Sequence, residues 1–241
     1  MADIFARTRL IFGDEAMERL SRARVALFGA GGVGGYAAEA LARSGIGALD
    51  IIDNDTVCES NLNRQIIALR STVGMYKTDA AAARIHDINP DCKVTGHKIF
   101  FLPENKDYFD FRQFDYIIDA IDTVSGKLAV IECANAAGVP VISCMGTGNK
   151  TDPSRLTIAD IFETSVCPLA RVMRHECRKR GIAKLKVVYS REEPRTPQNS
   201  ETSRSGKPVP GSTAFVPSAA GLLIASEVVR YITEGERNER S

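Results

Sequence analysis

Apolar residues along the chain fall into short runs that are separated by longer segments with helical spacing. Apolar and β-branched runs predict strands at 25–28, 49–52, 93–97, 116–118 and 139–143. Helices are expected between most of these strands. Because such alternation builds a mostly parallel sheet with helices on both faces, we expect an α/β fold with a Rossmann-like, doubly wound sheet.

The regions that flank this core follow different patterns. Residues 1–24 are expected to form a helical arm. After residue 147 the alternation weakens, and 156–160 and 185–189 are expected to be additional, antiparallel strands. The run 192–211 is rich in Pro, Ser and other polar residues and cannot bury apolar area, so we expect it to be mobile.

A C-terminal helix is expected within 212–235, where apolar residues follow an amphipathic pattern. Glu227 and Arg230 interrupt its apolar run too soon for a membrane span. The helix should pack on the sheet or on a partner subunit, and peripheral contact with a membrane stays open. At 241 residues the chain can form one large domain, with a nucleotide-binding core at 25–150 and a basic region at 151–191.

A glycine-rich turn separates the first predicted strand from the first core helix. Its sequence, GAGGVG, contains Gly29, Gly31, Gly32 and Gly34. Glycines allow the backbone to turn tightly and approach a phosphate, which the N–H groups at the helix start then bind. Asp53 ends the second strand about 20 residues later, where an acid accepts hydrogen bonds from ribose hydroxyls. The pattern predicts a nucleotide site.

The following polar segment indicates which nucleotide binds. It contains Asp55 and Asn61 as further candidate nucleotide ligands, and Arg64 and Lys77 as cations. In a nicotinamide oxidoreductase the glycine turn already serves the bridging phosphates, so these two cations would have no evident task. A triphosphate needs them, because they stabilise charge as pyrophosphate leaves. The segment favours ATP over a dinucleotide.

Two acids follow the predicted strand at 116–118. A carboxylate at the carboxyl end of such a strand lies on the ligand side of the sheet and can hold Mg²⁺. We assign this role to Asp122, and we expect Asp119 to cap the next helix.

Five motifs in this order resemble the E1-like (ThiF, MoeB and HesA) adenylyltransferases, which include the activators of sulfur-carrier and ubiquitin-like proteins. The motifs are GAGGVG, the acidic turn at 53–55, SNLNRQ at 60–65, VGxxK at 73–77 and AIDT at 120–123.

The resemblance implies that Asp53 binds ribose, that Arg64 and Lys77 bind the triphosphate, and that Asp122 positions Mg²⁺. It also implies a homodimer in which Arg9 enters the ATP site of the partner subunit. By composition alone, Arg9 would be only a solvated charge. A bound monovalent cation and a sulfur-transfer protein partner stay open.

The cysteines separate branches of this superfamily. No two of the six form a CxxC pair, so we expect no structural zinc, which would need two such pairs. The segments 152–182 and 185–197 instead resemble the tRNA threonylcarbamoyladenosine dehydratase branch. These enzymes use ATP to activate the carboxylate of a modified adenosine in tRNA, which then cyclises. Such a reaction needs no thioester, and we assign no catalytic cysteine.

The charge distribution agrees with an RNA substrate. The formal net charge is only +1, yet cations gather between residues 171 and 191. Such a stripe can follow a phosphate backbone, although a solvated helix face is the alternative. The candidate tRNA ligands are Arg171, Arg174, Arg178, Lys179, Arg180 and Lys184.

We therefore expect an ATP-dependent tRNA threonylcarbamoyladenosine dehydratase. The alternative is a zinc-free adenylyltransferase that activates the C-terminus of a sulfur-carrier or ubiquitin-like protein. A third possibility, a binding module without catalysis, conflicts with the presence of Arg64, Lys77 and Asp122. The N-terminus carries no secretory signal and the cysteines show no disulfide pattern, so a cytoplasmic location is expected.

Overall fold

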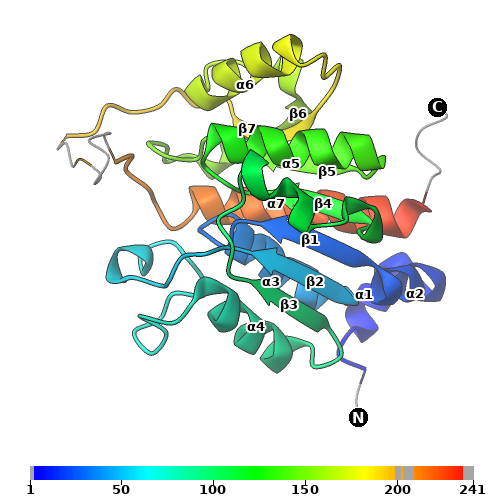
Figure 1. The fold of residues 1–241 in the computed structure, drawn as a ribbon. Helices are drawn as coiled ribbons and strands as arrows, with labels where there is room; N and C mark the ends of the chain where they lie inside the picture. The colour runs from blue at the N-terminus through cyan, green and yellow to red at the C-terminus, as the bar shows by residue number, and fades with distance from the viewer. Residues whose placement is uncertain (1–2, 199–201, 203–208, 236–241) are drawn as a thin grey trace.

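The computed structural model describes residues 3–198, 202 and 209–235. The predicted mobile run 192–211 therefore lies partly outside the described residues. Seven strands form one sheet with the order β3-β2-β1-β4-β5-β7-β6 (Figure 1). Their bounds are β1 (Arg24–Phe28), β2 (Ala48–Ile52), β3 (Lys93–His97), β4 (Tyr116–Asp119), β5 (Val141–Cys144), β6 (Leu156–Asp160) and β7 (Lys186–Ser190).

The strand order reverses between β1 and β4. The chain passes from β1 to β2 and β3 on one side, and then returns to place β4 on the other side of β1. All these neighbours are parallel. In doubly wound sheets, ligands bind at the carboxyl ends of the strands beside such a switch point. The predicted α/β class and the parallel core are confirmed.

The two additional strands correct one expectation. β6 is antiparallel to β7, as predicted, but β7 is parallel to β5, with Ile142 opposite Lys186. β7 lies inside the sheet, and its Val187 and Val188 are fully buried. A continuous apolar run of this kind is typical of a parallel strand covered on both faces. The prediction of an antiparallel β7 was wrong.

Helices cover both faces of the sheet. One face carries α2 (Asp14–Arg22), α3 (Gly34–Ser44), α4 (Lys77–Ile88) and α7 (Val216–Glu234), whose apolar residues share one core cluster. The other carries α5 (Val124–Ala137) and α6 (Pro168–Lys179). The predicted N-terminal arm consists of α2 and of α1 (Ala6–Phe12), which has no buried residue.

The C-terminal helix packs on its own chain. α7 buries Val216, Ala220, Ile224 and Val228 in the core that it shares with α3. A side chain at Gly221 would place its Cβ 2.3 Å from the Val33 carbonyl oxygen, so the two helices meet at backbone distance. No helix within the described ranges is long and apolar enough to cross a membrane.

Candidate functional site: a nucleotide site at the carboxyl edge of the sheet

The glycine turn between β1 and α3 has a shape that only glycine permits. Gly29 has φ +93°, and a Cβ there would lie 2.8 Å from the Ala120 carbonyl oxygen. A Cβ on Gly34 would lie 1.8 Å from the Gly29 carbonyl oxygen. By contrast, a Cβ on Gly31 would meet nothing closer than 3.9 Å. The turn is therefore tight on its inner side and open beside Gly31, where the start of α3 presents N–H groups to a phosphate.

Asp53 lies directly beside this turn. One carboxylate oxygen accepts a hydrogen bond from the Ala30 N–H at 2.7 Å, and the other accepts one from the Asp55 N–H at 2.8 Å. Each oxygen keeps a second lone pair. The carboxylate can thus stabilise the turn and still accept hydrogen bonds from ribose hydroxyls.

Lys77 is held at the edge of the predicted triphosphate site. It begins α4, and its Nζ lies 2.6 Å from an oxygen of Asp55. The lysine side chain is 8% exposed, whereas the Asp55 side chain is 61% exposed. The loop between them closes through a bridge of Thr56 with Tyr76. This arrangement fixes a cation beside Asp53 and Asp55.

Arg64 lies over the glycine turn. Its Cγ is 3.4 Å from the position of a Cβ on Gly32, and its Nη1 donates to the Ser60 carbonyl oxygen and to Asn63 Oδ1, each at 2.8 Å. Asn61 is buried, and its Oδ1 accepts a hydrogen bond from the Cys58 N–H at 3.2 Å. Arg64 is therefore placed to meet phosphate, while Asn61 orders the loop that carries Arg64.

Gln65 was not among the predicted site residues. It is 7% exposed, its Oε1 has no hydrogen-bond partner in the described structure, and its Nε2 lies 3.9 Å from the position of a Cβ on Gly31. A buried amide with an unsatisfied oxygen costs free energy unless a ligand or water completes it. Its signal in the sequence was its place directly after Arg64 in one motif.

Asp122 is exposed at the carboxyl end of β4, beside β1. Its Oδ1 accepts a hydrogen bond from Thr123 Oγ1 at 3.3 Å, and it makes no ion pair with any described residue. Mg²⁺ commonly binds through one or two carboxylates together with substrate phosphates. Asp122 fits that role. Over the described ranges, no three His, Cys, Asp or Glu residues form a group that could hold a metal by themselves.

Asp119 was predicted to cap the next helix, but it does not. α5 begins with Thr123 as its N-cap, whereas Asp119 is fully buried at the end of β4. Its Oδ2 accepts a hydrogen bond from Ser143 Oγ at 2.6 Å and lies 3.0 Å from Lys127 Nζ. The prediction was wrong because the chain turns away from the strand before α5 begins, so the carboxylate points into the core.

Arg9 lies apart from the other predicted residues. It projects from α1, and hydrogen-bonded ion pairs with Asp14 at 2.8 Å and Asp3 at 3.0 Å raise the pKa of its guanidinium. The neighbouring Phe5 packs at Gly45, which ends α3 at the end opposite the glycine turn. α1 and the loop after β2 accordingly lie at opposite ends of the molecule in Figure 1. Arg9 does not join the site of its own subunit.

The predicted basic stripe is divided between internal contacts and exposed cations. Arg174 Nη1 donates to the Thr164 carbonyl oxygen at 3.0 Å, and the Arg178 guanidinium stacks 5.2 Å from the centre of the Phe162 ring. Arg180 pairs with Glu132 at 2.9 Å and also with Glu176. Of the six candidate tRNA ligands, three are exposed and make neither an ion pair nor a ring contact with any described residue, namely Arg171, Lys179 and Lys184.

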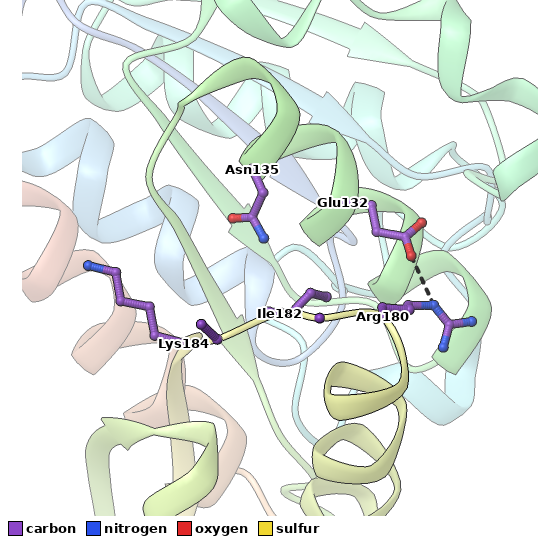
Figure 2. Close-up of a pocket in the computed structure, with 7 residues that line it drawn as sticks. Glu132, Asn135, Arg180, Ile182 and Lys184 are labelled. Atoms are coloured by element: carbon purple, nitrogen blue, oxygen red, sulfur yellow. Dashed lines mark ion pairs between the residues drawn. The ribbon is translucent and has the colours of Figure 1, made fainter.

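A groove of about 400 Å³ lies between α5 and the loop after α6 (Figure 2). Figure 2 shows Glu132 joined to Arg180 on one side, with Lys184 farther along the loop. The loop leads into the amino end of β7, which is parallel to β1 through β4 and β5. The groove therefore opens at the edge of the sheet opposite the glycine turn and is separate from the nucleotide site.

Two core cysteines are poorly suited to nucleophilic chemistry. Burial raises the pKa of Cys92 to about 11 and that of Cys144 to about 12. Both therefore stay protonated at neutral pH, and the thiol is a weak nucleophile compared with the thiolate.

Comparison with known proteins places these features in one family. The ThiF family model matches residues 5–241. The chain is 45% identical over 235 residues to the tRNA threonylcarbamoyladenosine dehydratase of Bacillus subtilis, covering 93% of this chain and 92% of that protein. The Escherichia coli protein of the same name is 39% identical over 206 residues, covering 82% of this chain and 77% of that protein.

Solved structures agree with the sequence matches. The crystal structure of the E. coli tRNA N6-threonylcarbamoyladenosine dehydratase, TcdA, in complex with ATP has a TM-score of 0.87 and 34% sequence identity, covering 95% of this chain and 93% of that chain. The corresponding complex with AMP has a TM-score of 0.88 at 34% identity and covers 95% of this chain and 94% of that chain. The resemblance inferred from the five motifs is confirmed, and the chain belongs to the ThiF family.

Proposed function

We propose that this chain is an ATP-dependent tRNA threonylcarbamoyladenosine dehydratase. The observation that carries the proposal is its 45% identity, over nearly the whole length of both chains, to a relative of that name. The E. coli relative has the same name, and its structures contain ATP and AMP. Both facts agree with the ATP-dependent dehydratase expected from the sequence. The open glycine turn, with Asp53 beside it, supplies the matching nucleotide site.

The first step is adenylation. An oxygen of the substrate carboxylate attacks the α-phosphorus of ATP, the bond between the α-phosphorus and the bridging oxygen breaks, and pyrophosphate leaves. The glycine turn binds phosphate, Asp53 orients the ribose, and Arg64 and Lys77 stabilise the charge on the departing pyrophosphate. Mg²⁺ held by Asp122 would neutralise further phosphate charge.

The second step is ring closure. A nitrogen of the same substituent attacks the activated carbonyl and expels AMP, which carries away one oxygen of the original carboxylate. The substrate thus loses the elements of water, while ATP becomes AMP and pyrophosphate. Because both reacting groups belong to one nucleoside, the second step avoids the entropy cost of a bimolecular encounter.

Finer assignments belong to this proposal. Mg²⁺ binds at Asp122, tRNA contacts the exposed cations of the basic region, and the enzyme works in the cytoplasm as a homodimer. Arg9 enters the ATP site of the partner subunit, which is consistent with its distance from the site of its own subunit. Support for the dimer also comes from α1, which exposes Leu10 and Ile11.

Nucleoside analysis of tRNA tests the substrate and the reaction together. tRNA that carries the threonylcarbamoyl group is incubated with enzyme and ATP, digested, and analysed by mass spectrometry. We expect loss of one water from the modified adenosine, together with one AMP for each event. If only a protein with a Gly-Gly C-terminus stimulates exchange of pyrophosphate into ATP, the sulfur-carrier or ubiquitin-like alternative replaces this proposal.

A further inference from the structure

A fully buried ion pair lies beneath the carboxyl edge of β4. Asp119 ends β4 and Lys127 lies in the first half of α5, and both side chains are 0% exposed. Lys127 Nζ lies 3.0 Å from Asp119 Oδ2. Removal of one charge from such a pair leaves the other unpaired in the core, so each residue requires the other.

The two charged groups also hold the two peptide units that flank Ile121. Asp119 Oδ1 accepts a hydrogen bond from the Ile121 N–H at 3.2 Å, and Lys127 Nζ donates to the Ile121 carbonyl oxygen at 2.8 Å. Ser143 Oγ donates to the second oxygen of Asp119. The backbone immediately before Asp122 is therefore fixed by buried groups of opposite charge, although Asp122 itself is exposed.

The same backbone segment lies against the glycine turn. The Ala120 N–H donates to the Phe28 carbonyl oxygen at 2.8 Å, and the Ala120 carbonyl oxygen limits the space at Gly29. A change in this segment would therefore alter the place of Asp122 relative to the turn that meets the phosphates.

We infer that Asp119 and Lys127 are positioning residues for adenylation, which hold the peptide before Asp122 so that its carboxylate meets the metal-bound triphosphate. The inference rests on the proposed function, because that proposal assigns the metal to Asp122. It gives the buried pair a task beyond stabilising the fold. Groups that orient a metal ligand without touching the metal commonly contribute about 10- to 100-fold to metal affinity.

The test measures metal binding instead of turnover. Mn²⁺ affinity is determined by electron paramagnetic resonance with an ATP analogue that has a methylene group between the α- and β-phosphorus atoms. Asp119→Asn and Lys127→Met should each weaken Mn²⁺ binding by about 10- to 100-fold. Affinity for the analogue in EDTA should stay unchanged, because neither residue contacts the nucleotide.

Three further variants make the result decisive. Asp50→Asn removes another buried carboxylate, which pairs with the partly exposed Arg24 and with His97, and it should lower the Tm without changing Mn²⁺ affinity. The double variant Asp119→Asn with Lys127→Met leaves no unpaired charge at this buried site, so it should fold even if a single variant does not, and it should still bind Mn²⁺ weakly. Asp122→Asn tests the proposed metal ligand itself.

The outcomes separate the two claims. If Asp122→Asn leaves Mn²⁺ affinity unchanged, the metal assignment in the proposed function fails. If Asp122→Asn weakens Mn²⁺ binding but the folded Asp119, Lys127 and double variants bind like the wild type, the positioning inference is overturned. Equal weakening by Asp50→Asn would likewise overturn it, because the effect would then follow from lost stability alone.

Discussion

Two regions of the molecule gather candidate functional side chains and are built in opposite ways: the nucleotide edge, which is the carboxyl edge of the sheet around the glycine turn, and the basic region at 151–191. At the nucleotide edge, Gly29 and Gly34 leave no room for side chains, and Asp53 and Lys77 already have partners that fix their positions. In the basic region, Arg174, Arg178 and Arg180 have partners within the chain, whereas the exposed Arg171, Lys179 and Lys184 make no ion pair with any described residue. A site for one small ligand is preorganised, whereas a surface for a polyanion can work with cations that no partner holds in place.

The largest expected effect tests the preorganised side of this comparison. Lys77→Ala should lower pyrophosphate exchange into ATP by about 10²–10³-fold, because it removes one fixed cation that stabilises the negative charge of the departing pyrophosphate. The matched control is Lys98→Ala, since this exposed lysine pairs with Asp79 and lies over the Tyr76 ring nearby. Near-normal exchange by folded Lys77→Ala would remove the triphosphate role.

A second experiment asks whether that edge is complete within one subunit. Inactive Arg9→Ala and Lys77→Ala proteins are mixed under conditions that permit subunit exchange. We expect about one working site in each mixed dimer, since one site then contains both wild-type residues. Native mass spectrometry verifies the exchange, and mixed dimers without any recovered activity would contradict the shared site.

The third experiment tests the unpaired cations of the basic region. The triple variant of Arg171, Lys179 and Lys184 to Ala should weaken tRNA binding and reduce the slope of log K against log salt by about 1 for each lost phosphate contact. ATP affinity should not change. Filter binding over a salt series measures the tRNA affinity and its salt slope. An unchanged slope would mean that these cations belong to an ordinary solvated surface.

Arg174→Ala serves as the matched control for that series. Because Arg174 holds Thr164, its removal should lower the free energy of unfolding while it changes the salt slope less than the triple variant does. A larger effect of Arg174→Ala on the salt slope would show that Arg174, too, contacts tRNA, and that its role is not confined to contacts within the chain.

The smallest expected effect concerns an ion pair that supports the nucleotide edge without joining it. Burial raises the pKa of Glu39, but hydrogen bonds from Arg84 and Arg43 together lower it below its ordinary value. Folding therefore gains stability above the ordinary carboxyl pKa and loses it as the pH falls through the lowered value. Glu39→Gln should cost about 1–3 kcal/mol at pH 7.

Urea unfolding at several pH values measures this contribution. The difference between wild type and Glu39→Gln should shrink as the pH falls below the ordinary carboxyl pKa, because the wild-type carboxyl becomes protonated there. A difference that stays constant with pH would mean that the charge of Glu39 contributes nothing. ATP affinity at pH 7 should be the same in both proteins.

Local sequence signals predicted the parts of the molecule whose geometry is local. The turn at Gly29 and the acid at Asp53 follow from strand–turn–helix spacing, and the parallel core follows from alternation. The roles of Asp119 and β7 depend on contacts between separate elements: Asp119 of β4 meets Ser143 of β5 and Lys127 of α5, and β7 pairs with β5. Such tertiary contacts leave no spacing pattern, and for the same reason the pairing of Arg180 with Glu132 was not foreseen. The pairing of Arg180 with Glu176, by contrast, has the i,i+4 spacing of neighbours on a helix.

The contact between α7 and the glycine turn has a consequence for the order of folding. Gly221 meets the Val33 carbonyl, and a Cβ on Gly32 would lie 3.3 Å from Pro217 Cβ, so one of the last helices along the chain supports one of its first turns. On the ribosome, the glycine motif is made early, but it cannot reach its final packing until α7 has emerged and docked. Contacts of such wide sequence separation slow folding. The first of the five motifs to be translated is therefore completed by a helix that is translated after all five.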